Sequence, residues 1–517
     1  MNRARVIYHI ARADFLERVR RYSFLVMLGA VIFLGYQAAI GNFTVQLGDY
    51  RGEFNSAWVG SMLAIIASLM LGWFGFYLVK GSVARDRETG VGQIMATTPL
   101  TRPLYMFGKW LSNFGVLIAM VIGLALAGIA IQFFAGESQE FDFLALLTPF
   151  LFVAVPMLAL TAALAVLFES IGFLSSGFGN LVYFILFGFT ISMAVTAGRS
   201  NPALDPVGFH LLQQSMSESA KAAFPDYGGG FVLGSTGDPI TGVFPWTGVQ
   251  WTFDIALTRF MFLSIAAGLA LASSIFFDRF DTSTGRSRRR NAPALASTSK
   301  AVPATRSLST LRLTPLNTSP KGFAFTRVLL LELKLLLKGK RWWWFVVAGG
   351  LIIAALVSPS EAVRAYILPI TWLWPVLIWS DLGSREIRHN TRQMVFASAA
   401  PLKRQLPAAW LAGFIVTILT GSGAAIKLLS TGDGTGLLAW LSGALFIPSL
   451  ALALGIWSNS PKLFEVIHVS LWYLIINGVT GVDYLGANSD GNIGFFIPLS
   501  LVLIATAFIG RAQHIQN

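Results

Sequence analysis

Charged residues are scarce in this sequence of 517 residues, since Asp, Glu, Lys and Arg together make up 12% of it. Soluble domains carry about twice that share. Cysteine is absent, which excludes disulfides, thiol chemistry and cysteine metal sites. None of the five histidines has a second histidine or a carboxylate at metal-ligand spacing. The G-x-S-x-G nucleophile motif and the G-x-x-x-x-G-K-[ST] phosphate loop are also missing. The sequence therefore predicts no catalytic residue, no metal site and no cofactor bound by the chain itself.

Long apolar runs take the place of charge. They extend over about 20 residues, long enough as helices to cross about 30 Å of hydrocarbon, whereas barrel strands would be about 10 residues long with alternating polarity. We therefore expect an all-α polytopic membrane protein with about 12 transmembrane helices. The first apolar run lacks a small-residue cleavage site, so we interpret it as a retained span. The predicted spans are 22–41, 58–80, 105–134, 145–168, 173–197, 253–277, 342–359, 365–382, 407–429, 437–458, 464–482 and 492–511.

Basic residues gather in alternate loops between these runs. With the N-terminus inside, 32 of the 38 Lys and Arg residues fall on the cytoplasmic side. This positive-inside pattern, helped by anionic lipid, explains the net charge of +13 without a nucleic-acid partner. We expect a multi-pass protein of the inner (plasma) membrane with both termini in the cytoplasm.

Two stretches lack the character of spans. Residues 198–252 are rich in Gly and Pro, and we expect them outside, with an amphipathic helix within 207–224. Residues 278–325 are rich in Ser, Thr, Pro and basic residues, a composition typical of a flexible cytoplasmic linker. The linker divides the chain into a first six-span unit, 1–277, and a second, 326–517.

The two units are related by an internal repeat. At an offset of 300, Arg85 matches Arg385, Asp86 matches Glu386, and Trp110 matches Trp410. "PLTR" (99–102) and "PLKR" (401–404) correspond after a shift of two residues. A charged loop thus occurs twice, each time between the second and third spans of its unit. Each unit also begins with a basic segment, and "RVLLLELKLLLKGKR" in the second predicts a helix lying in the membrane interface.

This loop resembles that of the ABC-2 family of ABC-transporter permeases. The family pattern is an acid, Gly-Thr, an apolar stretch, a Pro with a following Arg, and Gly-Lys opening the third span. The first copy matches with Asp86, Gly90, Pro99, Arg102, Gly108 and Lys109, although Val91 replaces the Thr. The second copy matches with Glu386, Thr391, Pro401 and Arg404, but Asn390 replaces the Gly and the Gly-Lys is missing.

The resemblance implies that each loop is a coupling helix that docks on a cytoplasmic ABC ATPase, with two ATPase copies beneath the pore. The chain is then a transport subunit rather than an enzyme, and ATP and magnesium bind in the partner. Mixed charges beside the apolar run "VGQIMATTPL" suit a protein-binding surface. We expect ATP-driven export of an amphiphilic substrate such as a lipid, peptide or antibiotic. The predicted docking residues are Arg85, Asp86, Arg87, Glu88, Gly90, Pro99, Arg102, Arg385, Glu386, Arg388, Thr391, Pro401 and Arg404.

Two alternatives stay open. A major-facilitator carrier has the motif G-x-x-x-D-R-x-G-R-R in this loop, and "GSVARDRETG" (81–90) is similar. Its spacing is one residue too long in two places and the closing basic pair is absent. Coupling to an ion gradient also needs titratable residues within spans, and mid-span carboxylates are essentially absent. The second alternative is a noncatalytic membrane scaffold that mounts other proteins on residues 198–252. Near that segment, Asp254 and Arg259 predict a local ion pair.

Overall fold

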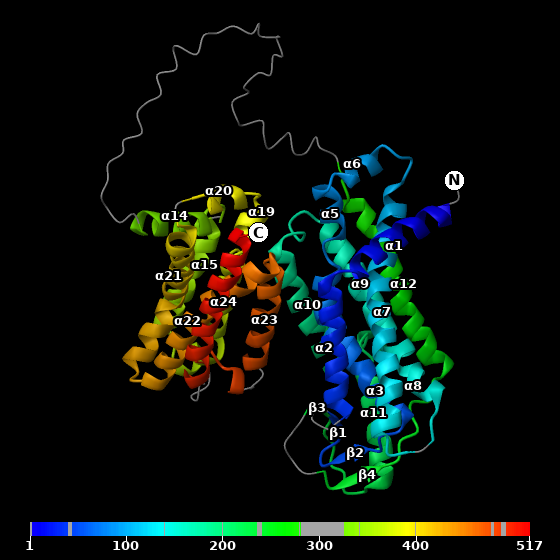
Figure 1. The fold of residues 1–517 in the computed structure, drawn as a ribbon. Coiled ribbons are helices and arrows are strands. Elements are labelled where there is room, and N and C mark those ends of the chain that lie inside the picture. The colour runs from blue at the N-terminus through cyan, green and yellow to red at the C-terminus, as the bar shows by residue number, and fades with distance from the viewer. Residues whose placement is uncertain are drawn as a thin grey trace, which may run out of the picture. The chain divides into compact units, whose positions relative to one another are not determined.

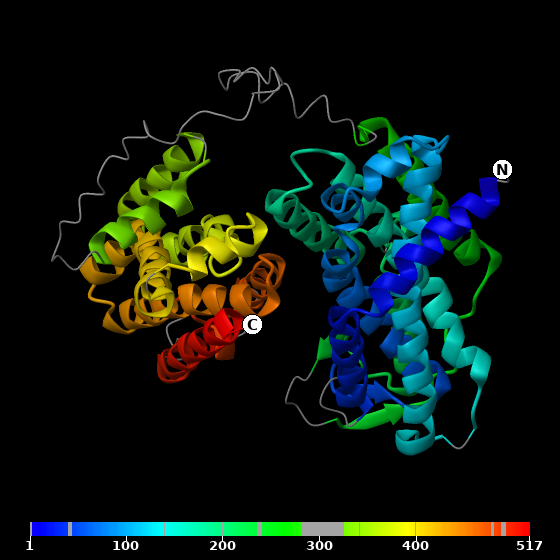
Figure 2. The ribbon, with the colours of Figure 1, turned by 45° about the horizontal axis from the view of Figure 1, so that its top comes forward.

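The computed structural model divides into two compact units, Met1–Asp281 and Thr282–Asn517, and each is built mainly of α-helices (Figures 1 and 2). The predicted linker, 278–325, lies outside the described residues apart from Asp278, Phe280 and Phe325. The structure describes residues 3–39, 44–138, 140–198, 200–234, 240–278, 280, 325–340, 342–398, 400–476, 480–486 and 493–516.

The described part of the first unit contains helices of very different length together with four short strands. Its helices are α1 (Arg3–Val19), α2 (Tyr22–Ala39), α3 (Ser56–Ile66), α4 (Gly72–Val79), α5 (Ser82–Glu88), α6 (Val91–Ala96), α7 (Arg102–Ala135), α8 (Phe143–Pro149), α9 (Val155–Ser170), α10 (Gly177–Thr196), α11 (Phe209–Ala223) and α12 (Phe253–Phe276). Its strands are β1 (Thr44–Gln46), β2 (Tyr50–Gly52), β3 (Val232–Gly234) and β4 (Gly242–Phe244).

The described part of the second unit is helical. Its helices are α14 (Phe325–Leu337), α15 (Trp342–Val357), α16 (Ser360–Ala362), α17 (Leu368–Leu373), α18 (Val376–Trp379), α19 (Arg385–Arg388), α20 (Arg392–Phe396), α21 (Pro401–Ser430), α22 (Gly434–Ser458), α23 (Lys462–Ile476) and α24 (Ile493–Gln516).

The predicted all-α polytopic membrane fold is confirmed. Among the described residues, nine helices are long and apolar enough to cross a membrane, and two more are added if each bent helix pair counts as one span. These pairs are α1 with α2, bent by 71°, and α14 with α15, bent by 101°. The predicted span 464–482 is present as α23, which has only 15 residues before the description stops at 476. The described residues thus hold nine to eleven spans rather than twelve.

The sharp bend between α14 and α15 has a local cause. Gly339 adopts φ +86°, a left-handed conformation that glycine takes at little cost and that commonly ends a helix. Before this bend, α14 is the predicted amphipathic helix, with Leu330, Leu331 and Leu335 exposed. Such a helix is suited to lie in a membrane interface.

Close helix contacts at small residues hold the spans together. In the first unit α7, with 34 residues, is the longest helix; it packs against α1, α2, α9 and α12, and α1 crosses it (Figures 1 and 2). Gly60 in α3 lies against α8 so tightly that an added Cβ would be 2.3 Å from the Leu146 carbonyl oxygen. Gly423 in α21 lies similarly close to α15, because an added Cβ would be 2.5 Å from the Ile352 carbonyl oxygen. Small residues at such crossings allow backbones to approach, as is usual in membrane helices.

The end of the first unit that carries the strands, called here the strand end, is formed by residues far apart in the sequence (Figure 1). β1 pairs with β3 in antiparallel fashion, and β2 pairs with β4 in parallel. The helix expected within 207–224 is present as α11, with Leu212, Met216 and Ala220 buried along one face. The expected ion pair of Arg259 with Asp254 is wrong, because Arg259 instead donates from Nη1 to the backbone carbonyl of Asp205 at 2.6 Å.

Candidate partner-binding site

Each charged loop folds as two short helices joined by a tight turn. In the first charged loop (residues 81–104) α5 and α6 meet at Gly90, with φ +74°. In the second charged loop (residues 383–404) α19 and α20 meet near Asn390, with φ +53°. Glycine adopts this left-handed conformation freely, and asparagine tolerates it better than most residues. The replacement of Gly by Asn in the second copy therefore preserves the turn.

The carboxylate of Asp86 faces the interior of the first unit. Its Oδ2 lies 2.6 Å from Nζ of Lys109 and accepts a hydrogen bond of 2.7 Å from the hydroxyl of Tyr105. Lys109 is fully buried and also reaches Asp14 Oδ2 in α1, at 2.7 Å. A buried charge without partners is costly, so this arrangement provides the ammonium with two carboxylates. Asp86 thereby ties the first charged loop to α7.

Arg85 ties the same loop to α1. Its guanidinium lies 3.3 Å from Asp14 Oδ1 and 2.8 Å from Glu17 Oε2. Asp14 is therefore shared between a loop arginine and the lysine of α7. The loop, α1 and α7 are joined through one network of charges.

The second unit has a corresponding network with different residues. Arg385 pairs with Glu332 of α14, the helix that precedes the first apolar helix of that unit. Glu386 accepts a hydrogen bond of 2.7 Å from Gln405, which matches Tyr105 at the offset of 300. Alanine stands at 409, where the first unit has Lys109, and the cation comes instead from Arg511 of α24, 3.5 Å from Glu386. The second charged loop is thus tied to α14, at the start of its unit, and to α21, which follows the loop, just as the first is tied to α1 and α7.

Electrostatics keep Glu386 ionised. Burial by itself raises the pKa of this carboxyl, but the Arg511 charge, hydrogen bonds that include the one from Gln405, and the Arg385 charge together outweigh burial. The pKa of Glu386 is therefore held below its ordinary value.

A further carboxylate, Glu169, caps the first charged loop. It is buried at the end of α9, and its oxygens accept hydrogen bonds from four successive backbone amides at the start of α5, those of residues 81–84. The first amides of a helix lack partners within the helix, and negative charge is favourable there. In contrast, Ser384 at the start of α19 makes no side-chain capping bond. The two loops are therefore held differently at their first turns.

The predicted docking residues fall into an internal and an exposed group. Asp86 and Glu386 are only 5% and 4% exposed, and Arg85 and Arg385 are partly buried in ion pairs. We therefore revise their assignment from direct contact with a partner to positioning of the loop. Gly90 forms the turn, Thr391 precedes α20 and Pro401 begins α21. The exposed residues are Arg87, Glu88, Pro99, Arg102, Arg388 and Arg404, of which Arg388 pairs with Asp381 at 2.8 Å.

Two exposed apolar side chains complete the surface of the loops. Ile94 of α6 is 68% exposed and Met394 of α20 is 73% exposed. They match at the offset of 300, so the two loops present an apolar residue at the same position. An exposed apolar side chain of this kind is a typical anchor for a protein contact. The internal partners Asp14, Glu169 and Glu332 went unnoticed in the sequence, where each is an isolated acid far from the loop it holds.

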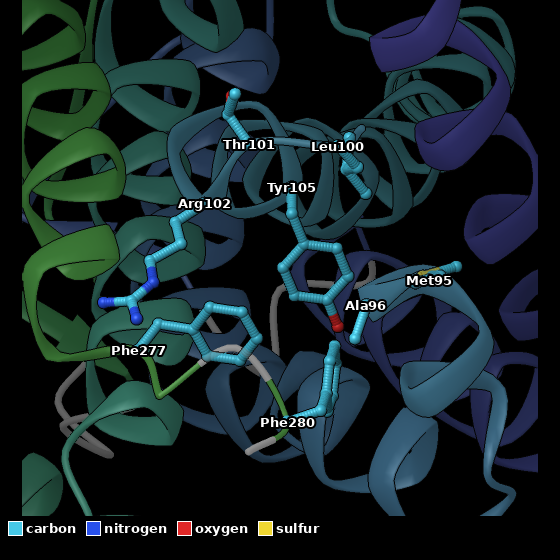
Figure 3. A pocket seen from close by; sticks show the side chains of 8 residues that line it. All are labelled: Met95, Ala96, Leu100, Thr101, Arg102, Tyr105, Phe277 and Phe280. Carbon is cyan, nitrogen blue, oxygen red and sulfur yellow. The ribbon is translucent and has the colours of Figure 1, made fainter. Parts of the chain in front are cut away.

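A shallow pocket lies beside α6 (Figure 3). Tyr105 stands at its centre, with the ring of Phe277 stacked at 5.1 Å and that of Phe280 edge-on at 5.5 Å. Phe280 also covers Gly92, where an added Cβ would be 2.4 Å from its ring. The cavity measures about 10 Å³, room for one water at most. The aromatic contacts around the pocket thus hold the end of α12 against the loop. The pocket itself is too small for a nucleotide or a substrate.

Residues 30–214 match the model of a known protein family described as ABC-2 family transporter protein. The matched segment includes the first charged loop and most of the first unit. No curated protein and no solved structure matches the chain. In the described residues, no group of three or more His, Asp and Glu side chains is placed to hold a metal ion.

Proposed function

We propose that this chain is an ABC-2 type permease, which the family match over residues 30–214 supports, and that it is the membrane subunit of an ABC transporter in which two such units are fused. The proposed partner is a cytoplasmic ABC ATPase, bound in two copies, one beneath each charged loop. ATP and magnesium bind in those partners, because this sequence has no phosphate-binding loop of its own.

The observation that carries the proposal is the pair of matching surfaces at Ile94 and Met394. Each apolar side chain is exposed on a short helix of a loop that also carries exposed charges. Apolar anchors supply affinity and flanking charges set orientation in such contacts. Two equal anchors on one chain suit a partner that binds in two copies.

The internal charge networks support a mechanical role for these surfaces. The first charged loop is bound to α1 through Arg85 and to α7 through Asp86. The second is bound to α14 through Arg385 and to α21 through Glu386. A partner that moves the loops therefore also moves the helices attached to them. ATP binding in the partner would then shift the population between inward-facing and outward-facing states.

Matching contacts elsewhere support the fusion of two related units. Trp110 stacks on Phe114 and donates to the Ala159 carbonyl of α9 at 3.1 Å. Trp410 stacks on Phe414 and donates to Ser449 of α22 at 2.9 Å. Each tryptophan thus joins the third predicted span of its unit to the fourth.

Each unit also has an ion pair between the segment before its second predicted span and the loop after its third. Arg51, before the second predicted span, pairs with Glu137 in the loop after the third. In the second unit Arg364 and Asp433 pair across the corresponding elements.

We further propose that the transporter exports an amphiphilic substrate from the inner (plasma) membrane, with both termini and both charged loops in the cytoplasm. The bias of Lys and Arg toward one side supports this orientation. Because the loops bind the ATPase, they have to lie on the side where ATP is available.

The test is co-purification from native membranes. Affinity-tagged chain is isolated as wild type, as the Ile94→Asp and Met394→Asp variants, and as the double variant. Val243→Asp, at an exposed apolar position of β4, is the matched control. We expect an ATPase with Walker motifs to accompany the wild type and the control, less of it with each single variant, and almost none with the double variant. Undiminished ATPase with the double variant, or none with wild type, would contradict the proposal.

A further inference from the structure

A second and much larger cavity lies at the strand end of the first unit. Its volume is about 590 Å³, within the usual range for small-molecule sites. One wall is the end of α10 at Val195 and Thr196, and another is the turn of Tyr227, Gly229 and Gly230. Between them runs one face of α11. No role proposed above uses this cavity.

The wall formed by α11 is entirely polar. The residues that line it recur at intervals of three and four, so they share one face of the helix: His210, Gln213, Gln214, Ser217, Glu218 and Lys221. The opposite face, with Leu212, Met216 and Ala220, is buried in the protein. The core contacts of α11 thus account for its apolar face only, and its polar face is left to line the cavity.

The charges on this wall are of both signs. Glu218 and Lys221 lie about one helical turn apart, and both are exposed. His210 lines the same wall. The wall therefore offers a cation to an anionic group and a carboxylate to a cationic one. This is the complement of a zwitterion rather than of a simple anion.

An exposed stripe on α10 connects this cavity with an apolar surface. Ile185, Phe189, Ser192 and Thr196 recur at intervals of four, three and four and are all exposed. Thr196 lines the cavity, and α10 is long and apolar enough to cross a membrane. Ile185 and Phe189 would therefore lie at membrane depth. A molecule with its head in the cavity has room to lay an alkyl chain along this stripe.

We propose that this cavity binds the head group of a zwitterionic phospholipid. The phosphate is held by Lys221, the ammonium group by Glu218, and the acyl chains lie against Ile185 and Phe189. This deepens the proposed function by naming the substrate class. Binding at the site requires neither ATP nor the ATPase, so it can fail while the proposed function holds, and the reverse is equally possible.

The test is isothermal titration calorimetry on the purified full-length chain in detergent. The probe is dihexanoyl-phosphatidylethanolamine below its micelle concentration. Glycerophosphoethanolamine, inorganic phosphate and dihexanoyl-phosphatidylglycerol are titrated in parallel, to separate the contributions of chains, anion and ammonium. The variants are Lys221→Gln and Glu218→Gln, at exposed positions where folding is little affected. Lys427→Gln, a lysine outside the cavity, is the control.

We expect saturable binding of dihexanoyl-phosphatidylethanolamine, weakened at least tenfold by each cavity variant and unchanged by Lys427→Gln. Glycerophosphoethanolamine should bind more weakly, because it lacks the chains. Absence of saturable binding would overturn the proposal, as would binding that both cavity variants leave intact. If inorganic phosphate bound as tightly as dihexanoyl-phosphatidylethanolamine, the cavity would be a simple anion site and the proposal would be wrong. If dihexanoyl-phosphatidylglycerol bound as tightly, the role of Glu218 would be contradicted.

Discussion

Lys109 Nζ lies 2.6 Å from Asp86 Oδ2, and no part of the lysine side chain reaches the surface. Asp86 was predicted from the sequence as a contact for a partner protein. Its pairing with a buried lysine instead makes it part of the support that holds the loop. Charge reversal at Asp86 would therefore disturb the fold before it reported on any partner.

Removal of Lys109 should destabilise the first unit strongly. Lys109→Met leaves the carboxylates of Asp14 and Asp86 without their shared ammonium. Breaking one side of a buried ion pair typically costs about 3–5 kcal/mol, and we expect a clearly lower melting temperature in detergent. The double variant Asp86→Asn, Lys109→Met should recover part of the loss, because it removes the charge of Asp86 together with its cation, whereas Asp14 keeps Arg85 and Arg18 as partners. A double variant less stable than Lys109→Met would show that the network does not act as described.

The turns of the two loops predict a loss of stability for one substitution and almost no change for another. At Gly90, with φ +74° and no atom within 4 Å of an added Cβ, only the backbone conformation opposes alanine. Gly90→Ala should therefore cost about 1–2 kcal/mol. Asn390→Gly keeps a residue suited to φ +53° and should change stability by less than about 0.5 kcal/mol. Melting temperatures of the two variants in one detergent give the comparison, and equal losses would count against the shared turn.

Loss of the carboxylate at Glu169 should loosen the first turn of α5. Glu169→Gln keeps the size of the side chain but removes the negative charge that faces four backbone amides. We expect a cost of about 1–2 kcal/mol and faster hydrogen–deuterium exchange at residues 81–84. Exchange at α19, which lacks a side-chain cap, serves as the internal control. Unchanged exchange at 81–84 would show that Glu169 does not hold this turn.

Acid should reduce the stability that Glu386 gives to the second charged loop. The pKa of Glu386 is lower in the folded protein than its ordinary value, because Arg511, the hydrogen bonds and Arg385 outweigh burial. Its stabilising effect is therefore complete above the ordinary carboxyl pKa of about 4.3 and is lost as the pH falls through the lower, folded value. Melting curves of wild type and Glu386→Gln should differ at pH 7 and approach each other as the pH falls below the ordinary value of about 4.3 and through the lower, folded value. A difference that widens toward acid would contradict this sign.

The membrane spans were predictable from the sequence because they follow from local patterns. An apolar run of sufficient length specifies a helix wherever it lies, and α11 and α14 followed from amphipathic periodicity in the same way. The repeat at an offset of 300 located both charged loops and their matching arginines and acids.

The internal role of these acids could not be predicted, because it depends on partners distant in the sequence. Asp14 and Glu169 reach the first loop from α1 and from the end of α9, and Arg511 reaches Glu386 from α24. Nothing in the local sequence distinguishes a buried acid of this kind from an exposed one. The burial of Lys109 could not be predicted for the same reason. The exposed anchors Ile94 and Met394 became distinct only once burial of their neighbours was known.

Site-specific cross-linking tests the central claim, that the two charged loops bind an ATPase, most directly. The chain has no cysteine, so Ile94→Cys and Met394→Cys each introduce a single thiol for a photoactivatable cross-linker without background. Val243→Cys, at an exposed position of β4, is the control. In native membranes we predict an adduct with a Walker-motif ATPase from both loop positions and none from the control. The account would be contradicted if neither loop position gave an adduct that contains an ATPase. It would also be contradicted if Val243→Cys gave the same ATPase adduct.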